Sequence, residues 1–250
     1  MSAPEFPAQH AVARLRAERL ARALKPFVAR GSKSERCTHC RVPATHCLCA
    51  YRVQVSTPSR AGVCLLMADI EPLKPTNTGW LIADVVSDTY AFGWVRTEVD
   101  PTLLALLADP QWQPYVVFPG EYSAPERVVS EVAAADSGKR PLFVLLDATW
   151  SEARKMFRKS PYLDRLPVLS LQSEQISRYR LRRSKRDDHF CTAEVAALCL
   201  ELAGETRAAG VLDAYFDVFS QHYLQARRLV PLAPGDDVHL RLQSALELPA

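Results

Sequence analysis

The stretch LFVLLDATWSEARKMF (residues 142–157) decides the fold of this 250-residue chain. Its first five residues form an apolar run, which is typical of a strand buried on both faces of a parallel sheet. Thr149 and Glu152 then form a T-x-x-E capping box, so we expect a helix to begin at about Trp150. Asp147 is therefore expected in a turn, outside the core, at the carboxyl end of a parallel strand. Ligands bind at that edge of α/β sheets.

Short apolar segments alternate with helical patterns along the rest of the chain. Strands are expected at 62–67, 91–96, 115–118, 142–146 and 168–171, and helices at 12–28, 80–90, 101–108, from Trp150, 192–203 and 212–228. This alternation predicts an α/β fold with a parallel sheet and helices on both faces.

Four regions follow from these patterns. We expect a basic N-terminal helix, a cysteine-rich module, one α/β domain and a C-terminal tail without regular structure, at 1–36, 37–60, 61–232 and 233–250.

The composition is that of an ordinary globular protein, with 48% hydrophobic and 24% charged residues. This excludes the fibrous and disordered classes. The uncharged runs are far shorter than a bilayer span, and the first ten residues lack the apolar segment of a signal peptide. We therefore expect a cytoplasmic protein without a membrane partner, most simply a monomer.

Positive charge is concentrated in two segments, although the net charge is only +3. Residues 1–36 hold eight Lys and Arg against three acidic residues, and residues 151–186 hold eleven against three. Two such segments on an otherwise acidic chain favour a polyanionic partner, in particular nucleic acid.

The second basic segment has two patterns. Arg154 and Arg158 lie one turn apart on the helix that follows Asp147. Further along, arginines alternate with Tyr and Leu in the period of an extended chain, a pattern suited to RNA phosphates and an unpaired base. The arginines of this ladder are Arg178, Arg180, Arg182 and Arg183.

Four of the seven cysteines form a C-x2-C-x6-C-x-C cluster, at Cys37, Cys40, Cys47 and Cys49. Four thiolates complete a tetrahedral zinc site without an open position, so this spacing predicts a structural zinc. His39 and His46 are alternative ligands, ranked below the cysteines because four thiols already suffice. Four thiols without a metal are the other reading.

Three further turns carry candidate ligand contacts. PTNTG (75–79) offers hydroxyl and amide groups, and its glycine allows a close approach to the backbone; FPGE (118–121) ends a strand abruptly, and TAEV (192–195) begins a helix. Each turn is also explained by ordinary capping or chain reversal. Together with Asp147, they can line one pocket.

These segments resemble a known family. Over about residues 36–205 the chain resembles the DTW-domain family in six motifs. They are D-A-T-W at 147–150, the cysteine cluster, E-P-L-K-P-T-N-T-G at 71–79, F-P-G-E at 118–121, S-R-Y-R-L-R at 177–182 and T-A-E-V at 192–195. Ala68 stands where family members often have a His.

The resemblance implies a SPOUT-like, knotted fold and a tRNA-uridine aminocarboxypropyltransferase. Such an enzyme moves the 3-amino-3-carboxypropyl group of S-adenosylmethionine to N3 of a uridine and releases methylthioadenosine. The implied catalytic residues are Asp147, Thr149 and Trp150. The implied cofactor-binding residues are Thr76, Asn77, Thr78, Gly79, Phe118, Pro119, Gly120, Glu121, Leu169, Leu171, Thr192 and Ala193.

Several readings of the site stay open at this point. Asp147 is the candidate general base for the uridine, or it holds the α-ammonium group of the cofactor. Trp150 stacks on a base or belongs to the core. The competing functions are a SPOUT-type RNA methyltransferase and a non-catalytic, zinc-containing RNA-binding protein.

Overall fold

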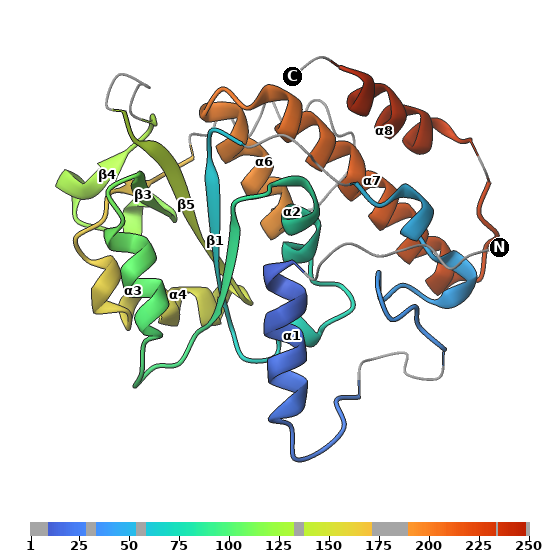
Figure 1. Ribbon diagram of the computed structural model, residues 1–250, viewed down its shortest axis with the longest axis horizontal. Helices are drawn as coiled ribbons and strands as arrows, with labels where there is room; N and C mark the ends of the chain where they lie inside the picture. The colour runs from blue at the N-terminus through green and yellow to red at the C-terminus, as the bar shows by residue number, and fades with distance from the viewer. Residues whose placement is uncertain are drawn as a thin grey trace.

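The computed structural model of the protein describes residues 10–28, 34–53, 59–132, 138–171, 190–233 and 235–248. Its centre is a sheet of six strands in which every neighbouring pair is parallel, in the order β2-β1-β5-β3-β6-β4 (Figure 1). The strands are β1 (Gly62–Met67), β2 (Thr89–Gly93), β3 (Trp112–Val117), β4 (Val128–Val129), β5 (Arg140–Asp147) and β6 (Val168–Leu169). The expected parallel α/β sheet is confirmed. The SPOUT-like class and the knot stay predictions.

Helices cover both faces of this sheet, as predicted. On one face lie α1 (Ala11–Ala21), α2 (Gly79–Val85), α6 (Thr192–Leu202) and α7 (Thr206–Arg228), and on the other lie α3 (Pro101–Ala108) and α4 (Trp150–Arg158) (Figure 1).

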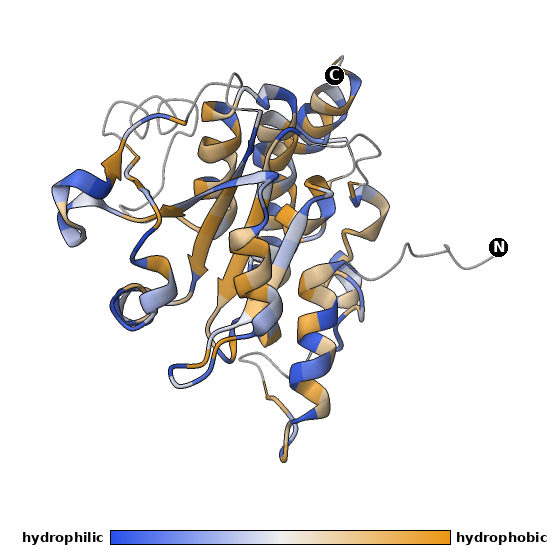
Figure 2. Cartoon of the chain, turned by 60° about the vertical axis from the view of Figure 1, so that its left-hand side comes forward, coloured by the Kyte–Doolittle hydropathy of each residue, from blue (hydrophilic) through white to orange (hydrophobic). Residues whose placement is uncertain are grey.

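Strand β1 shows how the sheet divides the core. Val63 and Leu65 join the cluster under α2, α6 and α7, whereas Cys64 and Leu66 face α3 and α4. Side chains of a strand alternate between the two faces, so both faces of β1 must be apolar. Figure 2 shows the central strands as hydrophobic over most of their length. This explains why the strand segments read as continuous apolar runs.

The N-terminal and cysteine-rich segments contribute to the same core as the sheet. Val12 and Leu15 of α1 are buried in the cluster that contains α2 and α7, and so are Cys40, Val42 and Leu48. Among the described residues, no helix combines the length and apolar character that crossing a membrane requires.

Two expected helices are shorter in the structure. The helix expected at 12–28 ends at Ala21, and Leu24 and Val28, which were expected on its apolar face, are exposed. Pro26 contributes to this early end, because a proline in a helix has no N–H to donate and its ring clashes with the carbonyl of the residue four positions earlier, here Arg22.

The helix expected at 80–90 ends at Val85, and the strand expected at 91–96 begins earlier, at Thr89, and ends at Gly93 as β2. Tyr90 pairs with Cys64 in a parallel ladder, so sheet pairing overrides the apolar helical pattern there. The strand β4, only two residues long, was not expected.

The C-terminal region is not an irregular tail. A helix, α8 (Asp237–Glu247), packs against α7 (Figure 1). Its N-cap residue Asp236 accepts a hydrogen bond from the His239 ring, whose Nε2 lies 2.9 Å from Nε2 of His222 on α7. Leu242 of α8 is buried in the same hydrophobic cluster as α7. The expectation of a loose tail was wrong: Val238, Leu242 and Ala245 recur at helical spacing after the N-cap Asp236, a helix signal that the sequence analysis did not use.

We predict that α8 contributes to the stability of the whole domain. Leu242→Ala should lower the free energy of unfolding by about 2–4 kcal/mol, because it removes a buried side chain. Leu240→Ala on the exposed face of the same helix should change it by less than about 0.5 kcal/mol. Urea denaturation of both variants measures the difference. Equal effects would show that α8 is not docked as described.

Candidate functional site

Asp147 is the last residue of β5, the strand at the middle of the sheet. It pairs with Met67 at the end of β1, and its backbone oxygen accepts a hydrogen bond of 3.0 Å from Ala68 N. Only 4% of Asp147 is exposed. The expectation that it sits in a turn outside the core was wrong, because the strand continues one residue further and covering segments enclose its end.

The Asp147 carboxylate joins two segments that are far apart in the sequence. Its Oδ2 accepts a hydrogen bond of 2.7 Å from Asn77 Nδ2, and its Oδ1 accepts one of 2.6 Å from Thr192 Oγ1. A Cβ on Gly79 would lie 2.9 Å from Asp147 Oδ2. Glycine is therefore required there for the 75–79 turn to close over the carboxylate.

The same two segments make a second contact beside Asp147. Ala193 N donates a 3.2 Å hydrogen bond to Thr78 Oγ1, and Asn77 Oδ1 accepts one of 3.1 Å from Gly79 N. The predicted residues Asn77, Thr78, Gly79, Thr192 and Ala193 thus surround one carboxylate. Thr76, predicted with them, is exposed at the outer side of the turn.

Burial dominates the ionisation of this group. It raises the pKa of the Asp147 carboxyl above its ordinary value, while the hydrogen bonds from Thr192 and Asn77 oppose the shift. Glu71, also buried, has a raised pKa for the same reason, opposed by its ion pair with Lys74. A carboxyl with a raised pKa is better suited to accept a proton near neutral pH.

Glu71 and Lys74 were not among the predicted site residues. The Lys74 charge lowers the pKa of Asp147, and the Asp147 charge raises the pKa of Glu71. Both residues therefore lie beside the site. The signal was present, since both belong to the E-P-L-K-P-T-N-T-G stretch at 71–79.

A second group of predicted residues forms an aromatic stack at the same edge of the sheet. Trp150 stacks on Phe118 with ring centroids 5.5 Å apart, and Phe118 stacks on Phe157 at 4.5 Å. Tyr122 meets Trp150 edge-on at 5.7 Å. Because Trp150 remains 45% exposed, it is not a core residue.

The turn after β3 lies against the end of β6. Phe118 N donates to Leu169 O at 3.2 Å, and Gly120 N donates to Ser170 Oγ at 3.0 Å. A Cβ on Gly120 would come within 2.9 Å of Val128 Cγ1, so any other residue there would push the Val128 side chain away. Ser170 was missed by the sequence analysis.

The other members of these two predicted turns differ in exposure. Leu169 is buried, so it offers only its backbone to this edge, and Leu171 packs against the core. Pro119 is half-buried and Glu121 is exposed.

The start of α4 is as predicted. Thr149 and Glu152 form the capping box, which fixes the helix just beyond Asp147. Arg154 and Arg158 are exposed on this helix, and the Arg154 guanidinium lies 5.0 Å from the centroid of the Tyr122 ring. The predicted RNA-binding residues Arg178, Arg180, Arg182 and Arg183 lie outside the described residues.

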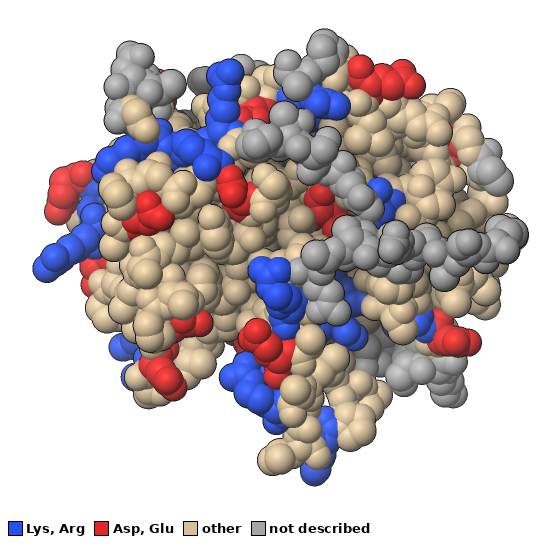
Figure 3. Space-filling model, in the orientation of Figure 1, with Lys and Arg blue, Asp and Glu red and all other residues tan. Residues whose placement is uncertain are grey.

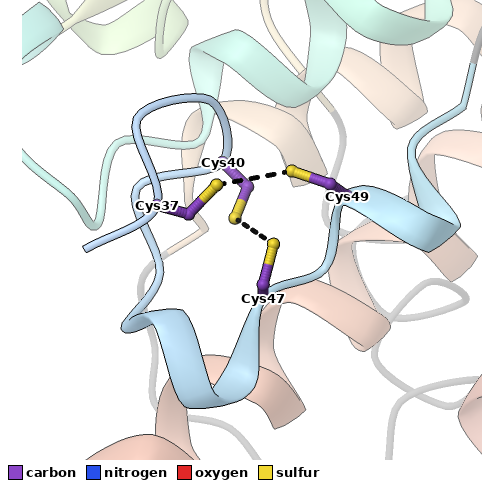
Figure 4. A group of neighbouring side chains, drawn as sticks. All are labelled: Cys37, Cys40, Cys47 and Cys49. Carbon is purple, nitrogen blue, oxygen red and sulfur yellow. Dashed lines mark hydrogen bonds between the residues drawn. The ribbon is translucent and has the colours of Figure 1, made fainter. Parts of the chain in front are cut away.

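The four clustered cysteines point toward one another (Figure 4). Their sulfur atoms all lie within 4.8 Å of one another, with Cys37 to Cys49 at 3.5 Å and Cys40 to Cys47 at 3.7 Å. In a tetrahedral zinc–thiolate site the sulfur atoms are about 3.8 Å apart, as Zn–S bonds of about 2.3 Å require. The four thiols therefore fit a metal ion of that geometry.

The backbone around the cluster is a tight turn. Cys37 N donates to Val42 O at 2.9 Å, and Arg41 N donates to Cys37 O at 3.0 Å. Arg41 has a φ of 64°, a conformation that favours glycine. Its buried side chain compensates, because Arg41 Nη1 donates to Pro72 O at 2.9 Å.

The alternative histidine ligand His46 is used elsewhere. Its Nε2 is 2.8 Å from Val230 O, and its Nδ1 is 2.9 Å from Thr45 Oγ1. Within the described part of the chain, the group of side chains placed to hold a metal ion consists of the four cysteines. Hydrogen bonding from Cys49 lowers the pKa of the Cys40 thiol to about 5, so one thiolate is already favoured at this site.

Comparison with known proteins agrees with the motifs. Residues 34–224 match the family described as DTW domain. A protein of Drosophila melanogaster named tRNA-uridine aminocarboxypropyltransferase 2 is 25% identical over 176 residues, which are 68% of this chain and 66% of that protein. The chain thus spans just under two thirds of the length of this relative. No solved structure matches.

The family match extends over most of the chain and contains the cysteine cluster, the 71–79 turn, Asp147 and the start of α6. The chain belongs to the DTW-domain family.

We predict that the cysteine cluster holds one zinc ion per chain. Cys40→Ser should lose this zinc and lower the melting temperature, because a structural zinc site contributes folding energy directly. Elemental analysis and thermal unfolding with and without a chelator measure both effects. Cys199→Ala, at a buried cysteine outside the cluster, should keep its zinc. Full zinc content in Cys40→Ser would contradict the assignment.

Proposed function

We propose that this protein transfers the 3-amino-3-carboxypropyl group of S-adenosylmethionine to N3 of a uridine in tRNA, with the zinc site in a structural role. The observation that carries the proposal is the buried Asp147 carboxylate, which belongs to the D-A-T-W motif and is bonded to Asn77 and Thr192. Family membership and the name of the fly relative support the same activity. The cytoplasm, where thiols stay reduced, is the compartment that suits four metal-binding thiols.

The donor is proposed to bind along the carboxyl edge of the sheet. The turn at 118–121 and the end of β6 lie together there, and Gly120 leaves no room for a side chain at their contact. The free face of Trp150 offers a surface on which adenine or the target base can stack. When bound, S-adenosylmethionine supplies the carboxypropyl group and leaves as methylthioadenosine.

Asp147 is proposed as the group that takes the N3 proton of the uridine. Uridine N3 is a poor nucleophile until this proton leaves, and burial raises the pKa of Asp147 toward the range of a useful base. Each carboxylate oxygen has two lone pairs, so the bonds from Asn77 and Thr192 leave acceptor capacity for a substrate. The alternative role, holding the α-ammonium group of the donor, uses the same capacity.

The tRNA is proposed to lie across α4. Arg154 and Arg158 are exposed there, beside the aromatic stack that ends in Trp150. This arrangement combines cationic groups for phosphates with a ring for a base, as proteins that bind unpaired nucleotides do. The arginine ladder at 178–183 stays a prediction for the same partner.

The experiment that tests the proposed function uses two labelled donors. The protein is incubated with tRNA and S-adenosylmethionine labelled either in the carboxypropyl group or in the methyl group. Label in tRNA from the carboxypropyl group alone supports the proposal. Label from the methyl group indicates the methyltransferase, and tRNA binding without any transfer indicates a non-catalytic RNA-binding protein.

We predict that Asp147→Asn lowers the rate of transfer by at least roughly 100-fold, because the amide cannot take a proton. The loss of stability should be small, about 1–2 kcal/mol, since the Asn oxygen can still accept from Asn77 while the Thr192 hydroxyl turns to accept from the new amide. Asp164→Asn, at an exposed position, is the charge-matched control.

Calorimetry with S-adenosylmethionine then separates the two roles of Asp147. Unchanged affinity in Asp147→Asn identifies the proton acceptor, and lost affinity identifies the ammonium partner. Turnover of Asp147→Asn close to that of the wild type would exclude both roles of Asp147.

A further inference from the structure

A polar cavity of about 300 Å³ lies between α1, the cysteine loop and α2, outside the site around Asp147. Its wall includes His10 and Arg16 from the α1 segment, Arg41 from the cysteine loop, Arg52, and Trp80 from α2. Figure 3 shows Lys and Arg side chains over the region of α1, with acidic side chains among them. The cavity wall itself, with three arginines, is cationic.

Three nitrogen atoms on these wall residues lack hydrogen-bond partners among the described residues. They are Nε of Arg16, Nη2 of Arg41 and Nε1 of Trp80. Arg41 is only 6% exposed and Trp80 only 3%, and both atoms are shielded from solvent. Buried donors are nearly always paired in native proteins, so three orphan donors around one cavity indicate a missing acceptor.

The positive charge of the wall is also incompletely neutralised. Arg52 pairs with Asp84 at 2.6 Å, and His10 lies 3.6 Å from the same carboxylate. Within the described part of the chain, Arg16 and Arg41 form no ion pair.

The cysteine cluster is the competing source of negative charge. A zinc ion with four thiolates carries two negative charges, and Arg41 directly follows Cys40. Those charges can offset part of the field at Arg41. They do not supply an acceptor to Arg16 or Trp80, which are not in the cysteine loop.

The cavity shares a wall with the candidate active site. Arg41 Nη1 donates to Pro72 O at 2.9 Å and to Lys74 O at 3.4 Å, in the segment that continues to Asn77. Trp80 directly follows Gly79, which closes over Asp147. An anion held in the cavity therefore lies behind the loop that carries the Asp147 contacts.

We propose that this cavity binds a phosphate group of the tRNA backbone, next to the nucleotide that enters the site. Guanidinium forks match phosphate oxygens in a bidentate geometry, and an indole N–H adds a neutral donor. S-adenosylmethionine carries no phosphate, so the backbone of the RNA is the source that the proposed reaction brings to this surface. That the RNA is a tRNA rests on the proposed function. That the cavity binds a phosphate group rests on the residues of its wall.

The phosphate site is tested first without RNA. Inorganic phosphate, titrated at constant ionic strength and followed by calorimetry and thermal unfolding, should bind the wild type and raise its melting temperature. Arg16→Gln should weaken that binding by at least roughly tenfold. Arg22→Gln, on an exposed residue just beyond the same helix, removes the same charge and should leave it unchanged. Equal binding by all three proteins would overturn the proposal.

A second variant fills the cavity from within the chain. Ala17 lies on the cavity wall and is exposed, so Ala17→Glu places a carboxylate near Arg16 and Arg41 without removing any contact. It should raise the melting temperature in the absence of phosphate and abolish the further rise with phosphate. A lower melting temperature in Ala17→Glu, together with no rise when phosphate is added to the wild type, would overturn the proposal, because the wall would then have no uncompensated positive charge.

The RNA arm separates this inference from the proposed function. With tRNA, Arg16→Gln should reduce the slope of log affinity against log salt by about 0.7–0.9, the loss of one phosphate contact, and Arg22→Gln should not. An unchanged slope while the wild type modifies tRNA would overturn the cavity as an RNA site and leave the proposed function intact. A reduced slope in Arg16→Gln, with no transfer by the wild type, would support the cavity as an RNA site and contradict the proposed function.

Discussion

The hydrogen bonds to the Asp147 carboxylate are the constraint on which the candidate site depends. Asp147 ends the central strand, and its two oxygens accept hydrogen bonds from Asn77, just before α2, and Thr192, the first residue of α6. Both helices lie on the same face of the sheet. A buried carboxylate that lost these donors would be left without compensation for its desolvation. The same two bonds therefore hold the covering turns in place and keep the charged form accessible.

This arrangement couples the site to the N-terminal half of the chain. The 71–79 segment is held over Asp147 from one side, and Arg41 holds its carbonyl groups from the other. Arg41 in turn depends on the cysteine turn, where it adopts a left-handed conformation. Loss of the predicted metal from the cluster should thus affect the carboxyl edge of the sheet, where Asp147 lies. The cysteine-rich segment and the sheet share one hydrophobic core, which gives this coupling a rigid path.

The sequence carries most of the fold, and the predictions fail where contacts between distant residues decide the structure. Buried strands were recognisable because both faces of a covered parallel sheet are apolar, and the capping box located the start of α4. The strand expected at 91–96 lies at Thr89–Gly93, because pairing with β1, a contact between distant residues, sets its bounds. The depth of Asp147 was missed because burial depends on Gly79 and Thr192, which only the folded chain brings near. Glu71 and Lys74 belong to the 71–79 motif, but their effect on the site depends on the burial of Glu71, which the sequence alone does not show.

The most direct measurement of the central claim is the pH dependence of kcat/KM for carboxypropyl transfer in the wild type and in Thr192→Val. This substitution keeps the shape of the side chain and removes the hydroxyl that donates to Asp147. A base must be ionised, so activity is lost as the pH falls through its pKa, and losing a donor to the carboxylate raises that pKa. The account predicts that the acidic limb moves to higher pH in Thr192→Val. An acidic limb at the same pH in both proteins would contradict the role of Asp147 as the proton acceptor.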